Sequence, residues 1–451
     1  MNQQEIHNVY FIGIGGIGMS ALAKYFQKIG KQVAGYDKTA TPLTKSLEDK
    51  GIVIHYKDTV TEIPNNFKNR LNTLVVYTPA VPNSHTELQY FIEQGFEVKK
   101  RSEVLGIITK DTFSFAVAGT HGKTTTSSIL AFLLHAVKAD FTAFLGGISE
   151  DFQSNFVFEG NQYSVVEADE FDRSFLRLYP NIACITSMDA DHLDIYGTAS
   201  ELEEAFRDFA AKLGTQGRLL IRKGLPIAGI TYGIEEQADY NIQNIRIQQG
   251  YYIVDIKTPK QLIENVAFTK PGRHNLLNAL AAFAMAAEAG FSENAMAAAL
   301  KDFAGVERRF SYQIRRDTLV YIDDYAHHPT EINAVFDAVS EMHPNLPITV
   351  VFQPHLFSRT QDFASDFASA LAKFDTILLL DIYPAREEPI PGITSGWLLA
   401  QINHPQKKIV DKNQLIVELK KNQEPGILVT LGAGDIGLEV PKIKKALAYA
   451  S

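Results

Sequence analysis

The chain has 451 residues, more than a single hydrophobic core usually serves, so two or three domains are expected. Its apolar fraction of 45% and charged fraction of 21% are ordinary for a globular protein and exclude long disordered stretches. The net charge of -9 excludes a general basic surface, so we expect neither nucleic-acid binding nor stable association with a membrane.

The single cysteine, Cys184, lies in an apolar run and excludes an internal disulfide, as in proteins of a reducing compartment. The first residues lack the pattern of a secretory signal, and no apolar stretch reaches 18 residues. We therefore expect a cytoplasmic protein. Nothing in the sequence predicts its oligomeric state.

The first part of the chain alternates between strand-like and helix-like segments. An apolar run at 8–14 is followed by a helical pattern to residue 29 and a second strand at 32–36. A strand at 73–77 and a helix at 87–94 continue the alternation. This pattern predicts a parallel-sheet, Rossmann-like domain at residues 1–110.

A glycine turn follows the first predicted strand and contains Gly13, Gly15, Gly16 and Gly18. The turn satisfies G-x-G-x-x-G, and Asp37 stands at the end of the next strand. Taken alone, this pattern is typical of dinucleotide binding, so a nicotinamide-dependent oxidoreductase is one alternative.

A second α/β unit is expected at residues 111–310. It opens with an apolar strand at 113–118, a glycine loop, and a helix at 124–137. Strands at 163–166 and 182–186 and helices at 199–213 and 275–289 follow. The pattern predicts the parallel sheet of a P-loop ATPase.

The glycine loop of this unit carries the strongest chemical signal. Its residues are Gly119, Thr120, His121, Gly122, Lys123, Thr124 and Thr125. Backbone N–H groups and the helix N-terminus can bind phosphate, Lys123 can reach the β and γ phosphates, and the Thr124 hydroxyl can bind Mg²⁺. The usual first glycine is replaced by Val117, so the loop departs from the general Walker pattern.

Acidic residues follow the next two predicted strands. Glu167, at the end of the strand 163–166, is the best placed to bind Mg²⁺. The later cluster D-A-D-H-L-D contains His192. For Glu167 the alternative is a solvated acidic loop, but the neighbouring phosphate loop favours a metal site. For the cluster with His192 the alternative is a capping or surface network.

A third, Rossmann-like unit is expected at residues 311–451, with strands at 319–322, 348–352, 376–380 and 427–431. The segments D-D-Y-A-H-H-P and Q-P-H-L-F-S-R-T directly follow two of these strands, where parallel sheets bind ligands. A second G-x-G-x-x-G at 432–437 is interpreted as a tight structural turn.

These motifs together resemble the Mur ligase family over essentially the whole chain. The segments that carry the resemblance are GIGGIGMS, AGTHGKTTT, EADEFDRSFL, DADHLDIYG, PGRHNLLNA, RRF, DDYAHHPTE, FQPH, YPAREEPIPG and GAGDIG. Their order and approximate spacing are those of the family.

The resemblance implies a role for each domain and for particular residues. The first domain would hold the UDP moiety with Gly13, Gly15, Gly16, Gly18 and Asp37, the central domain would bind ATP, and the third would close over ATP and bring the amino acid. The resemblance also implies these roles: Thr124 and Glu167 as ligands of one Mg²⁺, His192 as a ligand of a second, Asn275 and Asn278 at adenine, Asp324 at the ribose, Arg309 at the transferred phosphate, and His328, His355 and Arg359 at the amino acid and the reacting carboxylate.

The sequence departs from the family pattern at a few positions. Ser187, Asp189 and Leu356 stand where well-known members have Asn, Glu and Arg. The loss of charge at Leu356 leaves Arg359 as the expected anchor of the amino acid. No lysine occurs between His192 and Lys212, so the carbamylated lysine of several sister ligases is not expected.

The activity implied is an ATP- and Mg²⁺-dependent ligation of L-alanine to UDP-N-acetylmuramate, through an acyl phosphate, in peptidoglycan synthesis. A recycling ligase that adds a murein tripeptide to the same sugar nucleotide is the nearest alternative. The oxidoreductase leaves the phosphate loop unexplained. A P-loop switch protein leaves the His and Arg side chains of the third unit unexplained.

Overall fold

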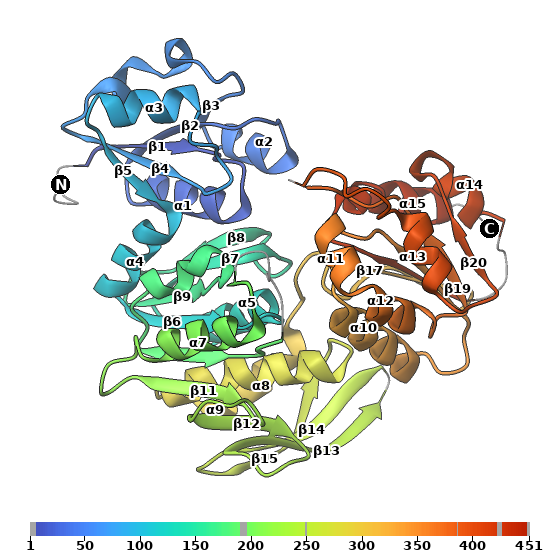
Figure 1. Ribbon diagram of the computed structural model, residues 1–451. Coiled ribbons are helices and arrows are strands. Elements are labelled where there is room, and N and C mark those ends of the chain that lie inside the picture. The colour runs from blue at the N-terminus through green and yellow to red at the C-terminus, as the bar shows by residue number, and fades with distance from the viewer. Residues whose placement is uncertain (1–5, 190–195, 249, 386, 422–425, 449–451) are drawn as a thin grey trace. The chain divides into compact units, whose positions relative to one another are not determined.

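The computed structural model describes residues 6–189, 196–248, 250–385, 387–421 and 426–448. The described chain is α/β, with helices arranged around three separate sheets (Figure 1). This confirms the predicted fold class.

The N-terminal sheet has five parallel strands in the order β3-β2-β1-β4-β5. Because β1 lies at the centre, the turn that follows it opens at the middle of the carboxyl edge, where such sheets bind ligands. The elements are β1 (Asn8–Ile12), α1 (Ile17–Lys28), β2 (Gln32–Tyr36), α2 (Pro42–Glu48), β3 (Val53–His55), β4 (Thr73–Tyr77), α3 (Thr86–Glu93), β5 (Glu97–Lys100) and α4 (Arg101–Asp111).

The central sheet has ten strands in the order β15-β14-β13-β12-β11-β10-β6-β9-β7-β8. Strand β6, which precedes the predicted phosphate loop, pairs in parallel with β9 and β10. The elements are β6 (Phe113–Ala118), α5 (Lys123–Ala136), β7 (Phe141–Ser149), β8 (Ser154–Phe158), β9 (Tyr163–Glu167), η4 (Phe171–Arg177), β10 (Ile182–Ile185), α7 (Ala199–Ala210), β11 (Arg218–Arg222), β12 (Ile230–Ile234), β13 (Tyr240–Gln248), β14 (Tyr251–Lys257), β15 (Leu262–Phe268), α8 (Arg273–Glu288) and α9 (Glu293–Ala299).

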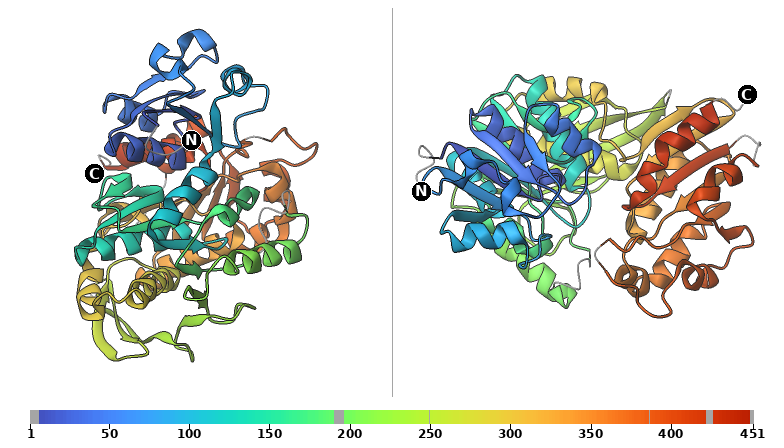
Figure 2. Two further views of the ribbon diagram at one scale, coloured as in Figure 1. Left: turned by 90° about the vertical axis from the view of Figure 1, so that its left-hand side faces the viewer. Right: turned by 90° about the horizontal axis from the view of Figure 1, so that it is seen from above.

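The C-terminal sheet has six strands in the order β16-β17-β21-β18-β19-β20, with β16 antiparallel to β17. Figure 2 shows its helices on both faces, and two apolar clusters fill the two sides, one under α10, α12 and α13 and one under α14 and α15. The elements are β16 (Ser311–Arg315), β17 (Leu319–Asp324), α10 (Pro329–Met342), β18 (Ile348–Phe352), α11 (Phe357–Asp362), α12 (Ala364–Leu371), β19 (Thr376–Leu379), α13 (Ser395–Gln401), β20 (Lys407–Ile409), α14 (Leu415–Leu419), β21 (Gly426–Leu431) and α15 (Val440–Ala448).

The chain forms two compact units. Unit 1 comprises Met1–Ile245, Ile253–Phe268 and Leu277–Ala304, and unit 2 comprises Arg246–Tyr252, Thr269–Leu276 and Gly305–Ser451. The N-terminal sheet and most of the central sheet therefore belong to one unit.

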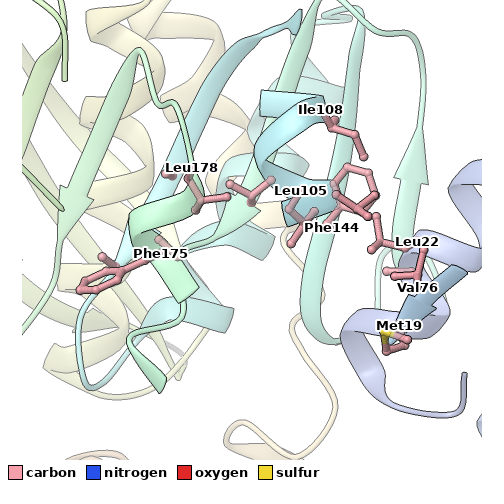
Figure 3. Close-up of a cluster of buried hydrophobic side chains, with 14 of the residues drawn as sticks. Met19, Leu22, Val76, Leu105, Ile108, Phe144, Phe175 and Leu178 are labelled. Atoms are coloured by element: carbon pink, nitrogen blue, oxygen red, sulfur yellow. The ribbon is translucent and has the colours of Figure 1, made fainter. Parts of the chain in front are cut away.

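One hydrophobic core joins these two sheets within unit 1. Met19 and Leu22 of α1 lie with Phe144 of β7, and the same cluster continues through Leu105 of α4 to Phe175 (Figure 3). Burial of this apolar surface holds the glycine turn before α1 in a defined place relative to the central sheet.

Several antiparallel strands were not expected from the sequence. The hairpin of β7 and β8 extends one side of the central sheet, and β16 forms an edge of the C-terminal sheet. Strand β8 alternates buried with half-buried side chains over only five residues, a short pattern that sequence periodicity detects poorly. In the described ranges, no helix combines the length and apolar character that a membrane crossing requires.

Candidate functional site

The predicted phosphate loop is a glycine turn between β6 and α5. Gly122 precedes the helix with φ +84°, a left-handed conformation that favours glycine. An added Cβ would lie 2.2 Å from Thr186 Oγ1 at Gly119 and 2.5 Å from Asn278 Oδ1 at Gly122. Both positions therefore require glycine, because a side chain there would clash with Thr186 or Asn278.

Ser187, at the end of β10, fixes this loop. Its hydroxyl accepts a hydrogen bond from the His121 backbone N–H at 2.8 Å and lies 2.9 Å from Thr120 Oγ1. Asp189 lies 3.2 Å from His121 Nε2, and its backbone N–H donates to Thr120 Oγ1 at 3.1 Å. Two of the positions that depart from the family pattern thus hold the loop directly.

Lys123 is the first residue of α5, and its ammonium is surrounded by oxygen. Nζ donates to Gly119 O at 2.7 Å and to Glu170 Oε1 and Oε2 at 2.9 and 2.8 Å. Burial lowers the pKa of Lys123, but the carboxylates of Glu170 and Asp169 outweigh burial and hold the pKa above its ordinary value. The side chain is therefore a fixed positive charge at neutral pH.

Glu167, at the end of β9, offers an oxygen for a cation. Its Oε1 accepts hydrogen bonds from the Gly146 N–H at 2.7 Å and the Ser127 hydroxyl at 3.3 Å. Among the described residues no donor reaches Oε2. Carboxylate and hydroxyl oxygens suit Mg²⁺, so Glu167 and the nearly buried Thr124 fit the ion implied by the family resemblance.

His192, the ligand predicted for a second metal ion, lies outside the described residues. Within those residues, no group of three or more His, Cys, Asp or Glu side chains is arranged to hold a metal ion. The expectation of a second ion therefore stays a prediction.

The two asparagines predicted at adenine both lie on α8. Asn278 is near the phosphate loop, since Thr126 Oγ1 donates to its Oδ1 at 3.3 Å. Asn275, in unit 2, donates to Pro271 O at 2.6 Å.

Thr125, the last residue of the predicted phosphate loop, lies in the first turn of α5 and is buried.

The N-terminal glycine turn is held by the carboxylate of Asp37, which follows the neighbouring strand β2. Asp37 Oδ2 accepts the Gly15 N–H at 2.7 Å, and Oδ1 accepts the Thr39 N–H at 3.1 Å. Gly13 donates to Tyr36 O at 2.8 Å, and Gly16 is the N-cap residue of α1. Asp37 therefore fixes the backbone of the turn through Gly15, and each of its oxygens keeps a lone pair for a further donor.

Arg101 lies beside this turn, at the carboxyl end of β5. Its Nη1 would be 2.7 Å from a Cβ at Gly18, so glycine is needed for the guanidinium to lie against α1. Among the described residues its one ionic partner is Asp169, at 3.7 Å. Arg101 and the N-terminus of α1 both present N–H donors and positive charge at the same place.

In unit 2, Asp324 at the end of β17 holds the R-R-F segment. Its two oxygens accept the backbone N–H groups of Phe310 at 2.6 Å and Ala326 at 2.7 Å. Burial raises the pKa of Asp324 to about 6, against the lowering effect of Arg309. Arg309 itself lies over the Tyr325 ring at 5.1 Å and 3.9 Å from Glu331.

The predicted His and Arg residues of unit 2 follow β17 and β18, two strands of the C-terminal sheet that are separated by β21. His328 begins α10 and accepts the Thr330 N–H at 3.3 Å, whereas His355 stacks on Tyr383 at 5.8 Å between ring centres. Arg359 is only 7% exposed, and its Nη1 is 3.4 Å from His355 Nδ1. The ring of His327 lies 5.9 Å from that of His355, so the two motifs meet.

The second G-x-G-x-x-G turn is filled by protein side chains. Gln353 Oε1 accepts the Ile436 N–H at 2.9 Å, and Arg308 Nη2 donates to Gly432 O at 2.7 Å. An added Cβ at Gly437 would lie 2.6 Å from Arg308 Nη1. This packing supports the prediction of a structural turn.

Sequence reasoning missed several residues of these sites. Glu170, Gly146 and Arg101 contact Lys123, Glu167 and the N-terminal turn, respectively. Glu170 stood in a segment already recognised as acidic, which was a usable signal. Gly146 and Arg101 lie in segments without a motif, and only folding brings them to the site.

Comparison with known proteins covers all three sheets. Family models match at residues 8–112 (Mur ligase family, catalytic domain), 117–286 (Mur ligase middle domain) and 308–434 (Mur ligase, glutamate ligase domain). The UDP-N-acetylmuramate–L-alanine ligase of Flavobacterium johnsoniae is 58% identical over 447 residues, covering 99% of each chain.

Solved structures agree with these matches. The UDP-N-acetylmuramate-alanine ligase of Thermotoga maritima superposes with a TM-score of 0.82 at 27% identity, covering 98% of this chain and 100% of the other. A murein peptide ligase from Psychrobacter arcticus shares the fold, with a TM-score of 0.71 at 21% identity over 99% of both chains. The chain belongs to the Mur ligase family.

Proposed function

We propose that this chain is an ATP-dependent ligase that forms an amide between the lactyl carboxylate of UDP-N-acetylmuramate and L-alanine in peptidoglycan synthesis. The observation that carries this proposal is 58% identity, over 99% of both chains, to a relative named for that reaction. We assign one role to each of the domains 1–110, 111–310 and 311–451, which contain the three sheets.

The central domain is assigned to ATP. The backbone of residues 119–122 binds the phosphates, and Lys123 places a positive charge beside them, because its pKa stays above its ordinary value. Thr124 and Glu167 would hold Mg²⁺, which neutralises charge on the transferred phosphoryl group when bound.

The N-terminal domain is assigned to the sugar nucleotide. The turn of Gly13, Gly15, Gly16 and Gly18 offers backbone N–H groups at the start of α1, where no side chain caps the helix. This arrangement suits the diphosphate of UDP-N-acetylmuramate. The dinucleotide alternative leaves the phosphate loop at residues 119–125 unexplained.

Unit 2 is assigned to the amino acid and to the transferred phosphate. Arg309 is held by the R-R-F segment that Asp324 anchors. His328, His355 and Arg359 offer imidazole and guanidinium groups suited to the carboxylate of L-alanine and the reacting carboxylate. Asn275, Asn278 and Asp324 are proposed near the adenosine part of ATP.

The reaction proceeds in two transfers. A carboxylate oxygen of the lactyl group attacks the γ phosphorus, the bond to the β-phosphate oxygen breaks, and ADP leaves. The amino group of L-alanine then attacks the acyl phosphate carbon, phosphate leaves, and the amine loses a proton. Lys123 and Arg309 stabilise the charge that moves between the oxygens.

The proposal is tested by phosphate release from ATP, Mg²⁺ and UDP-N-acetylmuramate, with L-alanine, with the murein tripeptide, or with neither. We expect release that depends on L-alanine. Release that depends only on the tripeptide would move the assignment to the recycling ligase. Lys123→Ala should lower turnover about a hundredfold or more in a folded protein, since it removes a preorganised charge.

A further inference from the structure

The ammonium of Lys123 has no N–H donor left over in this structure. A lysine ammonium carries three donors. Nζ contacts three acceptors, namely Gly119 O at 2.7 Å and Glu170 Oε1 and Oε2 at 2.9 and 2.8 Å. A phosphate oxygen that binds this lysine must therefore take the place of a protein acceptor.

The Glu170 carboxylate cannot simply turn into solvent. Its side chain is 0% exposed, and its backbone carbonyl accepts the Tyr196 hydroxyl at 2.6 Å. Tyr196 is itself 1% exposed. A carboxylate buried in this way is costly unless a cation stays close to it.

Lys123 already lies near more than one negative charge. Asp169 and Glu167 act on Lys123 together with Glu170, and the three carboxylates outweigh the effect of burial on its pKa. Polyphosphate brings further negative charge to the same ammonium. Glu170 and the phosphates therefore compete for one positive charge.

We propose that Glu170 is an internal counter-anion of the phosphate loop: it holds Lys123 in place, and bound nucleotide must draw the ammonium away from it. Glu170 is thus a positioning residue that acts through Lys123. The inference rests on the proposed function, because it takes residues 119–125 to be a nucleotide site.

Glu170→Gln removes the competing charge and keeps the size of the side chain. Nucleotide should then bind more tightly, because phosphate no longer displaces or repels a carboxylate. Damage to the loop would instead weaken binding. The direction of the change therefore distinguishes a counter-anion from a purely structural residue.

The experiment is calorimetric titration of the full chain with ADP, without Mg²⁺, so that a metal ion does not mask the charge. We expect the dissociation constant of Glu170→Gln to fall at least fivefold. The matched control is Asp172→Asn, which removes a nearby charge that is paired with Lys100 at 3.4 Å and has no contact with Lys123. Its dissociation constant should change less than twofold.

Unchanged or weaker ADP binding by folded Glu170→Gln overturns the proposal that Glu170 is a counter-anion of the phosphate loop. An equal gain in ADP affinity in Asp172→Asn also overturns the proposal. The gain would then follow from the lower net negative charge of the chain and not from the contact with Lys123. If wild type itself binds no ADP, the nucleotide site and the proposed function fail instead.

A second measurement tests the pairing of Glu170 with Lys123 through stability, without nucleotide binding. Lys123→Met, Glu170→Gln and the double variant are compared by urea unfolding without nucleotide. The free energy of unfolding of the double variant should be higher than the sum of the two single-variant losses predicts. The reason is that the double variant leaves neither charge buried without its partner. Additive losses would show that the pair is not coupled.

Discussion

The carboxylate of Glu167 lies directly against Gly146 of β7: an added Cβ at Gly146 would be 2.2 Å from Glu167 Oε2 and 2.5 Å from Oε1. The Gly146 N–H also donates to Oε1 at 2.7 Å. The position of the proposed Mg²⁺ ligand therefore depends on a glycine in another strand.

We predict that Gly146→Ala lowers turnover about tenfold or more and raises the Mg²⁺ concentration needed for half-maximal ADP binding, because the methyl group displaces Glu167. Titration of ADP binding against Mg²⁺ measures the second effect without catalysis. Gly214→Ala is the matched control, since a Cβ there meets no atom within 4 Å. If ADP binding by Gly146→Ala depended on Mg²⁺ as in wild type, Glu167 would not be a ligand of the metal ion.

Arg101 is predicted to bind the sugar nucleotide, because its guanidinium lies against Gly18 and its one ionic contact in the described chain, with Asp169 at 3.7 Å, is too long for a hydrogen bond. Arg101→Ala should weaken UDP-N-acetylmuramate binding by roughly 1.5 to 3 kcal/mol, the usual range for a charged hydrogen bond. ADP binding should change little. Arg207→Ala, an exposed arginine on α7, serves as control, and equal losses in both variants would refute a specific contact.

Arg359 is expected to bind the carboxylate of L-alanine through two parallel hydrogen bonds, which lysine cannot reproduce. Arg359→Lys should raise the Michaelis constant for L-alanine by the equivalent of roughly 1.5 to 3 kcal/mol, with little change for ATP or the sugar nucleotide. Arg316→Lys, at an exposed position of the same domain, is the control. An unaltered Michaelis constant for L-alanine would move the amino-acid site towards His328 and His355.

Glu87 should make stability depend on pH. It is fully buried, and burial raises its pKa to about 7 despite hydrogen bonds from Tyr10 and Thr59. Since the ordinary pKa of a glutamate side chain is 4.5, the folded chain holds a proton between these two pH values that the unfolded chain releases. The free energy of unfolding should therefore fall, by about 3 kcal/mol from this group, as pH rises through this window.

Urea unfolding of wild type and Glu87→Gln at pH 5 and pH 8 tests this effect. The variant should be relatively more stable at pH 8, because glutamine has no charge to bury. The exposed Glu264→Gln should follow wild type at both pH values. A parallel pH response of wild type and Glu87→Gln would be the contrary result.

Much of the site could be predicted from local sequence. The phosphate loop and the N-terminal glycine turn were recognised because a buried strand, a glycine turn and a helix follow one another within a short segment. The ends of β1, β6, β17 and β18 were located for the same reason, since each strand is a continuous apolar run bounded by turn residues. Local sequence therefore predicts at which strand ends the proposed site residues lie.

Tertiary structure decided which residues act together. Glu170 reaches Lys123 across 47 positions, and Gly146 reaches Glu167 across 21. The packing of α1 and α4 against the central sheet brings Arg101 to the N-terminal turn and to Asp169. These contacts depend on how strands are ordered in a sheet and how helices bury their apolar faces, and neither is encoded in the spacing of residues along a single segment.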